Sequence, residues 1–394
     1  MITSFFSHPS PTMSATSALF TPLKAGAVSL RNRIGMSALT RNRASATGVP
    51  TDLNVEYYRQ RAAGSAGIIV SEGVLVGPQG TEWPFAPGIW NDEQVSAWKK
   101  VVDAVHGEGA KIFAQLWHVG RVAHPDAPQQ KEAGIPVYAP SAIAARGGKF
   151  RFLPGEPGYV TPTAIEDPST LLPLWKKAAV NAKAAGFDGV EIHGANGYLL
   201  HEFLDSTANT RTDAWGGSPQ NRARFPLEVL KTVSEVYGSD RVSIKLSPTG
   251  GYNDVGMPLD ETIETFSYLI SEADKLKLAY ICLVRYSPFT DIVIDGKNRA
   301  TKHDVVATYA PLIKNSAKFA NSGFTGEEAA KFVADGTLDG VFFGVPWITN
   351  PDAAKRLQAG KELNMNVDFM TLYGTGSPDE EVQKKGYTDY PTAT

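Results

Sequence analysis

The chain has almost no cysteine and no long hydrophobic run. Cys282 is the one cysteine among 394 residues, which excludes an intramolecular disulfide framework and a cysteine-rich metal or iron–sulfur site. The longest apolar runs, such as residues 279–284, are far too short to span a bilayer. With so little cysteine, a reducing compartment fits, and we expect a cytoplasmic protein that does not associate with membranes.

The chain also lacks a strong charge and a targeting signal. A formal net charge of −3 gives no electrostatic basis for binding nucleic acid. Residues 1–17 are rich in Ser, Thr and Pro and contain no Lys or Arg, unlike a signal or transit peptide. We expect residues 1–17 to be a disordered extension, with Met13 as an alternative start. Residues 18–394 should form a single domain, because no interdomain linker is visible.

Short β-branched segments alternate with longer helical stretches, such as residues 168–185 and 218–236. The expected strands are residues 34–39, 67–71, 111–116, 189–193, 242–246, 278–284, 317–321 and 340–344. About eight such parallel strands predict an α/β fold, a single (β/α)8 TIM barrel. A doubly wound open sheet is the alternative, but it would require a GxGxxG motif after the first strand, and residues 35–40 do not provide one.

One interval of the barrel sequence is unusually long. Residues 119–163, between the third and fourth strands, are rich in Pro, Gly and Ala and show no clear helical period. A loop of this length in a compact fold is usually a lid or a small excursion over the active site. We therefore expect a lid-like excursion there.

Polar side chains follow several of the expected strands, where the active sites of such barrels lie. They are Thr40, Glu72, Gln115, His193, Asn196, Lys245 and Arg285. The set lacks a carboxylate pair and a serine or cysteine nucleophile with its base. His193 and His201 could meet a metal ion, but no nearby carboxylate or third imidazole is evident to complete the site, so we expect no metal site. Neutral donors and acceptors with one or two cations suit a flat, anion-forming cofactor such as a flavin.

The most informative segment is EIHGANGYLLHEFLDSTANTRTDAWGG, residues 191–217. It places His193, Asn196 and Tyr198 directly after a strand, a trio able to bind a carbonyl oxygen and deliver a proton beside it. This segment resembles the active-site segment of the Old Yellow Enzyme family of flavin-dependent ene-reductases. The resemblance extends over roughly residues 18–391 and includes the segments at residues 33–41, 71–73, 113–118, 244–248, 320–324, 343–347, 371–373 and 386–391.

The resemblance implies a tightly but non-covalently bound FMN, rather than FAD, because no adenine-binding fingerprint is visible. By similarity, Thr40 would bind flavin O4, the backbone of Ala38 and Leu39 would line the ring, and Gly73 would let the backbone approach it. Gln115 would bind the pyrimidine edge and Lys245 would lie beside N1 and O2. The phosphate would lie near the last two strands, at Asn321, Ser322, Gly323, Gly344 and Val345.

Two positions depart from many relatives. Lys245 stands where arginine is common, which keeps the charge but loses the planar fork. Val345 stands where an arginine commonly binds the phosphate. Its loss removes a charge-assisted contact worth ~1.5–3 kcal/mol, unless another cation replaces it.

The implied reaction is ping-pong. NADPH or NADH reduces FMN and leaves, and an enone, enal or maleimide takes its place. His193 and Asn196 would donate hydrogen bonds to the substrate carbonyl, and Tyr198 would protonate Cα. Trp117 and Tyr373 would wall the substrate pocket, with Tyr252 a weaker candidate. The chain is expected to be a monomer or a homodimer.

Other interpretations are simpler. A lone histidine is more often structural, but the trio favours function for His193, and a lysine after an apolar strand favours function for Lys245. Residues 209–217 are expected to form a structural loop tied by Arg211 and Asp213, and Cys282 an inert core thiol. Two rival functions remain: an aldolase or dehydratase with Lys245 as Schiff-base amine, and a flavoprotein that binds ligands or passes electrons without reducing alkenes.

Overall fold

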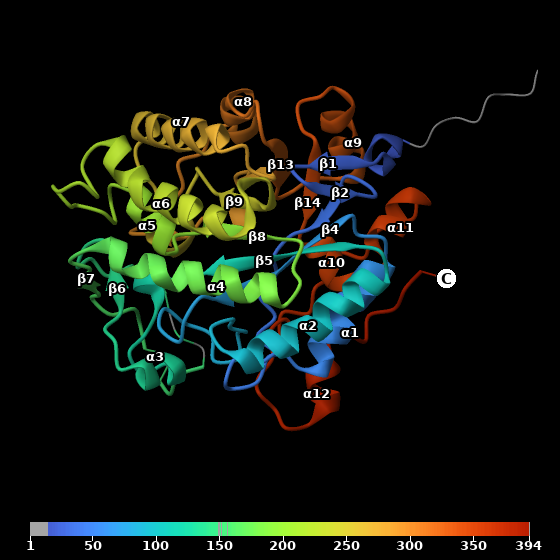
Figure 1. The fold of residues 1–394 in the computed structure, drawn as a ribbon, viewed down its shortest axis with the longest axis horizontal. Helices are drawn as coiled ribbons and strands as arrows, with labels where there is room; N and C mark the ends of the chain where they lie inside the picture. Colours follow the sequence, from blue (N-terminus) through green and yellow to red (C-terminus); the bar gives the residue numbers. More distant parts are fainter. Residues whose placement is uncertain (1–14, 149, 151, 156, 394) are drawn as a thin grey trace, which may run out of the picture.

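Eight parallel strands close into a barrel, with helices on its outside (Figure 1). The computed structural model describes residues 15–148, 150, 152–155 and 157–393. Around the barrel the strands are β3 (Ile34–Met36), β4 (Ile68–Leu75), β5 (Lys111–Trp117), β8 (Gly189–Gly194), β9 (Val242–Leu246), β10 (Tyr280–Val284), β13 (Ala317–Asn321) and β14 (Gly340–Phe343). The expected (β/α)8 barrel is confirmed. β3 ends earlier than expected and β4 later, with a register shift between Val70 and Gly73.

Several of the surrounding helices follow a residue whose side chain accepts a hydrogen bond from a backbone N–H of the first turn. The surrounding helices include α1 (Asp52–Ala63), α2 (Asp92–Gly107), α4 (Leu172–Ala184), α6 (Pro219–Tyr237), α7 (Leu259–Lys275), α8 (Val305–Tyr309), α9 (Gly326–Ala334) and α11 (Ala353–Gln358). Before α6, the Ser218 side chain accepts a hydrogen bond from the Asn221 N–H, and Pro219 occupies the first turn, where its missing N–H costs nothing. None of the helices in the described ranges is long and apolar enough to cross a membrane.

The interior of the barrel is filled by side chains, and its amino-terminal end is closed by a hairpin. The hairpin consists of β1 (Leu23–Ala25) and β2 (Val28–Leu30). Its apolar side chains pack with the interior residues Phe113, Tyr280 and Cys282. Cys282 is 1% exposed, and burial raises the pKa of its thiol, in agreement with an inert core position.

The interval between β5 and β8, called the excursion below, lies outside the barrel strands, and its role as a lid stays a prediction. It contains the short helix α3 (Pro128–Ala133), which was too short to give a helical period, and β6 (Tyr138–Ala139), which pairs with β7 (Thr163–Ala164). The Arg211 guanidinium donates to the carbonyl oxygens of Pro140 (3.1 Å), just after β6, and Glu166 (3.0 Å), just after β7. It also bonds Asp213, so the predicted Arg211–Asp213 tie is confirmed and additionally anchors the excursion.

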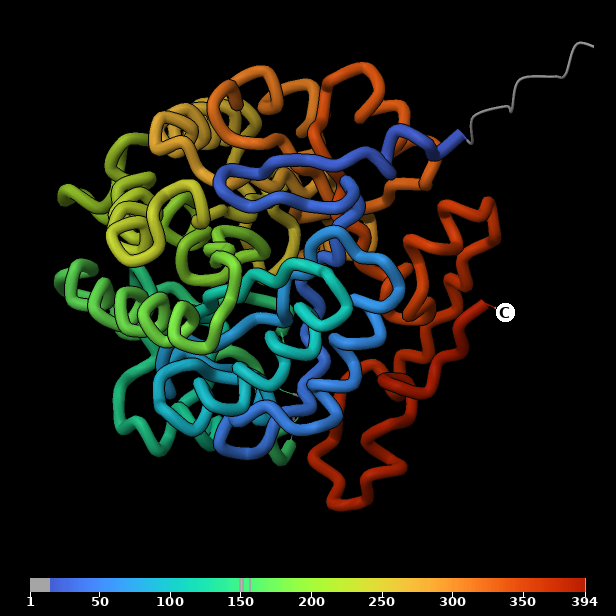
Figure 2. The backbone as a smooth tube through the Cα atoms, turned by 45° about the vertical axis from the view of Figure 1, so that its right-hand side comes forward, coloured from blue at the N-terminus to red at the C-terminus, as the bar shows by residue number. Residues whose placement is uncertain are grey.

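Both ends of the described chain are tied to the barrel. Residues 1–14 of the expected extension lie outside the described residues, but Thr16 is already anchored: its hydroxyl donates to the Leu357 carbonyl at 2.9 Å. The domain boundary expected at residue 17 stays a prediction. At the other end, the C-terminal segment runs along α1 (Figure 2), where the Tyr387 ring stacks on Tyr57 at 4.1 Å. The buried Arg41 guanidinium donates to the Leu372 and Gly386 carbonyls.

Candidate active site

The turn after β8 brings the predicted trio together at the mouth of the barrel. His193 lies near the end of β8, Asn196 has a left-handed φ of 60°, and Tyr198 precedes α5 (Leu199–Leu204). The rings of His193 and Tyr198 meet edge to face, with centroids 5.0 Å apart. The turn is held in place because the Asn196 N–H donates to Ser247 Oγ at 2.8 Å and its carbonyl accepts from Asn253 Nδ2 at 2.9 Å.

His193 is a neutral imidazole in this environment. Its Nδ1 accepts a hydrogen bond from the Ala195 N–H at 3.3 Å, so the ring proton resides on Nε2. Burial, with further contributions from Lys245 and His201, lowers the pKa of His193 well below its ordinary value. Nε2–H is therefore the group of this ring that can donate to a ligand.

Tyr198 is a protonated phenol. It is 7% exposed, and its ring packs edge to face on Trp117 with centroids 5.0 Å apart. Burial raises the pKa of Tyr198 well above its ordinary value, and Tyr252 and Glu82 reinforce the shift. The group therefore keeps its proton at neutral pH, as a general acid requires.

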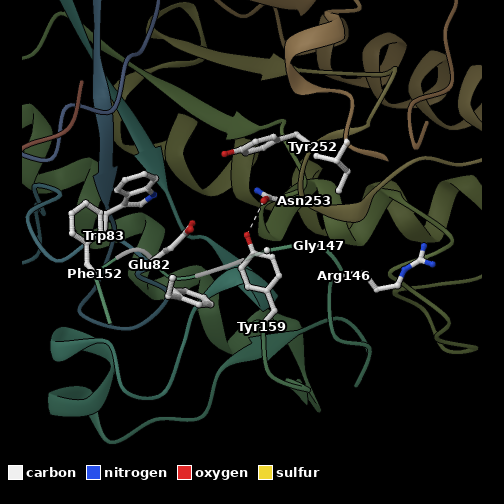
Figure 3. Close-up of a pocket in the computed structure, with 11 residues that line it drawn as sticks. Glu82, Trp83, Arg146, Gly147, Phe152, Tyr159, Tyr252 and Asn253 are labelled. Atoms are coloured by element: carbon white, nitrogen blue, oxygen red, sulfur yellow. Dashed lines mark hydrogen bonds between the residues drawn. The ribbon is translucent and has the colours of Figure 1, made fainter. Parts of the chain in front are cut away.

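A small cavity of about 160 Å³ lies beneath the excursion (Figure 3). Its lining residues come from the excursion and from the loops after β4, β9 and β10; they include Glu82, Trp83, Phe152, Tyr159, Tyr252, Asn253 and Ile292. The Tyr159 hydroxyl donates to Asn253 Oδ1 at 3.1 Å. Tyr373 packs on Trp83, with ring centroids 4.5 Å apart, so the C-terminal segment reaches the wall of this cavity.

Sequence reasoning missed most of this small cavity. Tyr252 was a weaker candidate and does line it. Glu82, Trp83 and Tyr159 belong to irregular loops, and no motif or strand end marks them. The structure gives Tyr373 a packing role beside the cavity wall; its contact with a substrate stays a prediction.

A larger cavity of about 450 Å³ crosses the carboxyl ends of β3, β9, β10, β13 and β14. This volume is within the range of small-molecule and cofactor sites, roughly 300–1,000 Å³. The predicted cofactor residues that line it are Ala38, Leu39, Lys245, Asn321, Ser322, Gly323, Gly344 and Val345, and Asn196 joins them. Among the described residues of its lining, Lys245 and Arg285 carry positive charge, and none is an aspartate or glutamate.

Lys245 connects this cavity to the trio. In the pairing of β8 with β9, Lys245 lies beside His193. Its Nζ donates to Ser37 Oγ at 2.9 Å, at the end of β3, and the side chain is 6% exposed. The charge therefore lies at the barrel mouth, close to the neutral His193.

His193 and Tyr198 do not themselves contribute to the lining of either cavity. His193 is 6% exposed, and the Trp117 ring stacks on it with centroids 6.2 Å apart. Because Trp117 also contacts Tyr198, this indole packs against two members of the trio, His193 and Tyr198. Its predicted place in the wall of a substrate pocket is compatible with that position.

Three predicted cofactor residues, Thr40, Gly73 and Gln115, do not line the larger cavity. A Cβ added at Gly73 would lie 2.3 Å from Trp117 Cε3, so the Trp117 ring requires a glycine there; the expected approach of a cofactor to the Gly73 backbone stays a prediction. Gln115 Nε2 donates to Glu191 Oε1 at 2.8 Å.

Glu191 is a buried carboxyl that sequence reasoning overlooked. Its Oε2 accepts a hydrogen bond from the Tyr280 hydroxyl at 2.8 Å, and burial raises its pKa. A carboxylate in the apolar strand β8 is the signal that would have revealed it, since buried acids require partners. It holds the Gln115 side chain inside the barrel.

Comparisons with known proteins agree with this geometry. The sequence profile of the NADH:flavin oxidoreductase / NADH oxidase family matches residues 18–364. The chanoclavine-I aldehyde reductase of Penicillium roqueforti is 39% identical over 379 residues, covering 94% of this chain and 95% of that protein.

Two solved structures superpose on nearly the whole chain. Morphinone reductase has a TM-score of 0.84 at 38% identity and covers 95% of this chain and 96% of its own. The old yellow enzyme from Trypanosoma cruzi has a TM-score of 0.86 at 33% identity and covers 97% of this chain and 100% of its own.

Proposed function

Because the chain belongs to the NADH:flavin oxidoreductase / NADH oxidase family, the family of Old Yellow Enzyme, we propose that it is an FMN-dependent ene-reductase. Its substrates would be small α,β-unsaturated aldehydes, ketones or imides, with NADPH or NADH as the reductant. The observation that carries the proposal is the contact between the neutral His193 ring and the Tyr198 ring, whose centroids are 5.0 Å apart. The cationic Lys245 lies beside His193.

The residues of the larger cavity fit FMN. A flat ring requires apolar walls, and Leu39, Phe342 and Phe343 supply them. The reduced flavin and its phosphate are anionic, and Lys245 and Arg285 supply positive charge without a competing acid in the described lining. When bound, FMN supplies hydride transfer from the nicotinamide and then to the substrate Cβ.

His193 and Asn196 would bind the substrate carbonyl. Negative charge grows on the carbonyl oxygen as the C=C bond is reduced, and a preorganised donor stabilises it. His193 Nε2–H is oriented by the backbone bond at Nδ1, and the Asn196 turn is held from both sides. One well-placed donor of this kind lowers the barrier by about 2.7–4 kcal/mol.

Tyr198 would supply the proton that Cα needs. Burial raises its pKa well above the ordinary value, so the phenol is present as the acid at working pH. Its ring is held by Trp117 and His193, which limits the positions that the hydroxyl can take. A positioned general acid typically contributes ~10²–10⁴-fold to the rate.

The Schiff-base alternative loses support from the family, whose described chemistry is that of flavin oxidoreductases. The second rival, a flavoprotein that does not reduce alkenes, differs from our proposal in one measurable product. The test therefore measures formation of the saturated product as well as the absorbance of the flavin.

The experiment starts with the absorbance spectrum of the purified protein before and after anaerobic addition of NADPH or NADH. A yellow protein that bleaches, and that then converts cyclohexenone or a maleimide to the saturated product, supports the proposal. A colourless protein that borohydride inactivates in the presence of substrate would instead indicate a Schiff-base enzyme. Bleaching without any saturated product would leave the flavoprotein but exclude the ene-reductase.

A further inference from the structure

The larger cavity has a gap in positive charge at its phosphate end. Val345, where the resemblance to the Old Yellow Enzyme family leads us to expect an arginine, begins α10 (Val345–Thr349). Val345 lines the cavity there and is 42% exposed, so it offers a phosphate only its backbone. If backbone amides alone held a phosphate in these water-accessible surroundings, it would lack the charge-assisted hydrogen bond that an arginine can provide.

Arg285 reaches the same end of the cavity from another strand. It follows β10 directly, and its backbone N–H donates to the Asn321 carbonyl at 3.0 Å. Its Nε donates to the Ser322 carbonyl at 2.9 Å. Its Nη2 lies 3.6 Å from the point where a Cβ on Gly323 would be. The guanidinium therefore rests against the loop after β13 that is expected to hold the phosphate.

The guanidinium is held firmly in this place. Its Cζ lies 3.5 Å from the centroid of the Phe324 ring, and Glu328 accepts from Nη1 at 2.6 Å and from Nη2 at 3.1 Å. An arginine has five N–H groups; the bonds to Ser322 and Glu328 use three of them, which leaves one on each Nη. These two N–H groups lie on opposite edges of the guanidinium, because Glu328 occupies the parallel pair, so each can donate a single hydrogen bond to a phosphate oxygen.

The charge distribution favours the same assignment. Lys245 is engaged with Ser37 at the barrel mouth, at the ring end of the cavity. Arg285 is the other cation among the described residues of the lining. Glu328 is outside that lining and offsets part of the arginine's charge, so the contribution of Arg285 to phosphate binding would come from a hydrogen bond donated by a remaining N–H group.

We propose that Arg285 binds the phosphate of the cofactor and takes over the role of the arginine absent from position 345. This inference rests on the proposed function, which supplies FMN as the cofactor of the larger cavity. It assigns the phosphate contact to the end of β10 rather than to the end of β14.

The test compares FMN with riboflavin, which has the same ring but no phosphate. The full-length protein is freed of flavin and titrated with each, following the quenching of flavin fluorescence. In Arg285→Met, FMN affinity should fall by roughly 10- to 100-fold while riboflavin affinity stays the same. Adding Val345→Arg to Arg285→Met should restore the preference for FMN, because it returns a guanidinium to the other side of the same cavity.

Two further variants separate binding from loop structure. Glu328→Gln removes the ion pair but keeps the guanidinium, and should retain the preference for FMN; Arg285→Lys should retain part of it. The assignment is overturned if Arg285→Met weakens FMN and riboflavin equally, or if it changes neither. A wild-type protein that binds neither flavin would overturn the proposed function itself, which is a distinguishable result.

Discussion

Replacing Tyr198 with phenylalanine removes one oxygen atom from the centre of the proposed site. The ring keeps its edge-to-face contacts with Trp117 and His193, both at 5.0 Å between centroids. The substitution leaves no large cavity, so the variant should fold normally and bind flavin as the wild type does. What it lacks is the phenolic O–H of the ring that packs against His193.

The expected loss follows from that role. Without a positioned acid, Cα must take its proton from water, and alkene reduction should slow by ~10²–10⁴-fold, about 2.7–5.4 kcal/mol of barrier at ~1.36 kcal/mol per tenfold. Reduction of the flavin by NADPH or NADH requires no proton from Tyr198 and should remain nearly unchanged. Because burial raises the pKa of Tyr198 well above its ordinary value, wild-type alkene reduction should also be flat with pH around neutrality.

Anaerobic stopped-flow absorbance measures the two half-reactions separately. Tyr309→Phe is a matched control, since it also removes a buried phenolic oxygen, one that contacts His303 outside the barrel. Alkene reduction at the wild-type rate in Tyr198→Phe would refute the role of the phenol as acid. Equal loss in both half-reactions would show instead that Tyr198 shapes the site.

Three other predictions concern the site and the fold. His193→Ala should weaken the binding of phenols to the oxidised protein and lower kcat by ~10²–10³-fold through loss of a carbonyl donor, measured by absorbance titration and steady-state kinetics; unchanged phenol binding would contradict it. Burial raises the pKa of Glu72 to about 7, above the ~4.5 expected in the unfolded chain. Between these two pH values the folded protein keeps the Glu72 proton and the unfolded chain has lost it. The free energy of unfolding therefore falls as the pH rises through this window. Glu72→Gln, which resembles the protonated acid, should match the wild type near pH ~4.5 and exceed its free energy of unfolding by up to about 3 kcal/mol near pH ~8; a pH-independent difference in urea unfolding would contradict this. Arg211→Ala should lower the free energy of unfolding by roughly 2 kcal/mol, because carbonyls of the excursion lose a charged donor, and should speed proteolysis within residues 140–166. Lys177→Ala, at the protein surface, serves as the control. Equal proteolysis of the two variants would refute the anchoring role of Arg211.

The barrel was predictable because its signal is local. Most strands are short apolar segments, and several helices carry their own cap, as Ser218 does before α6. The expected strands therefore coincide with the barrel strands, apart from their ends. β3 ends early and β4 continues to Leu75, because the last ladder bonds depend on neighbouring strands and not on propensity.

Part of the site was also local. His193, Asn196 and Tyr198 lie within six consecutive residues, so any strand–turn–helix at that point brings them together. Gln115 shows the limit of this reasoning. Its place near the end of a strand predicts a ligand contact, which stays a prediction. Its amide donates to Glu191, 76 positions away, and only the pairing of β5 with β8 brings that carboxyl within reach.

The sequence by itself determined the fold class, the family resemblance and the trio after β8, because each depends on residues close together in the chain. Only the tertiary structure decided what fills the space around them. Trp117 occupies the room beside Gly73, and the small cavity draws its lining from loops without a motif. Arg285 meets the Ser322 loop across 37 positions. Such contacts depend on barrel closure, which places strand ends side by side regardless of their distance in sequence.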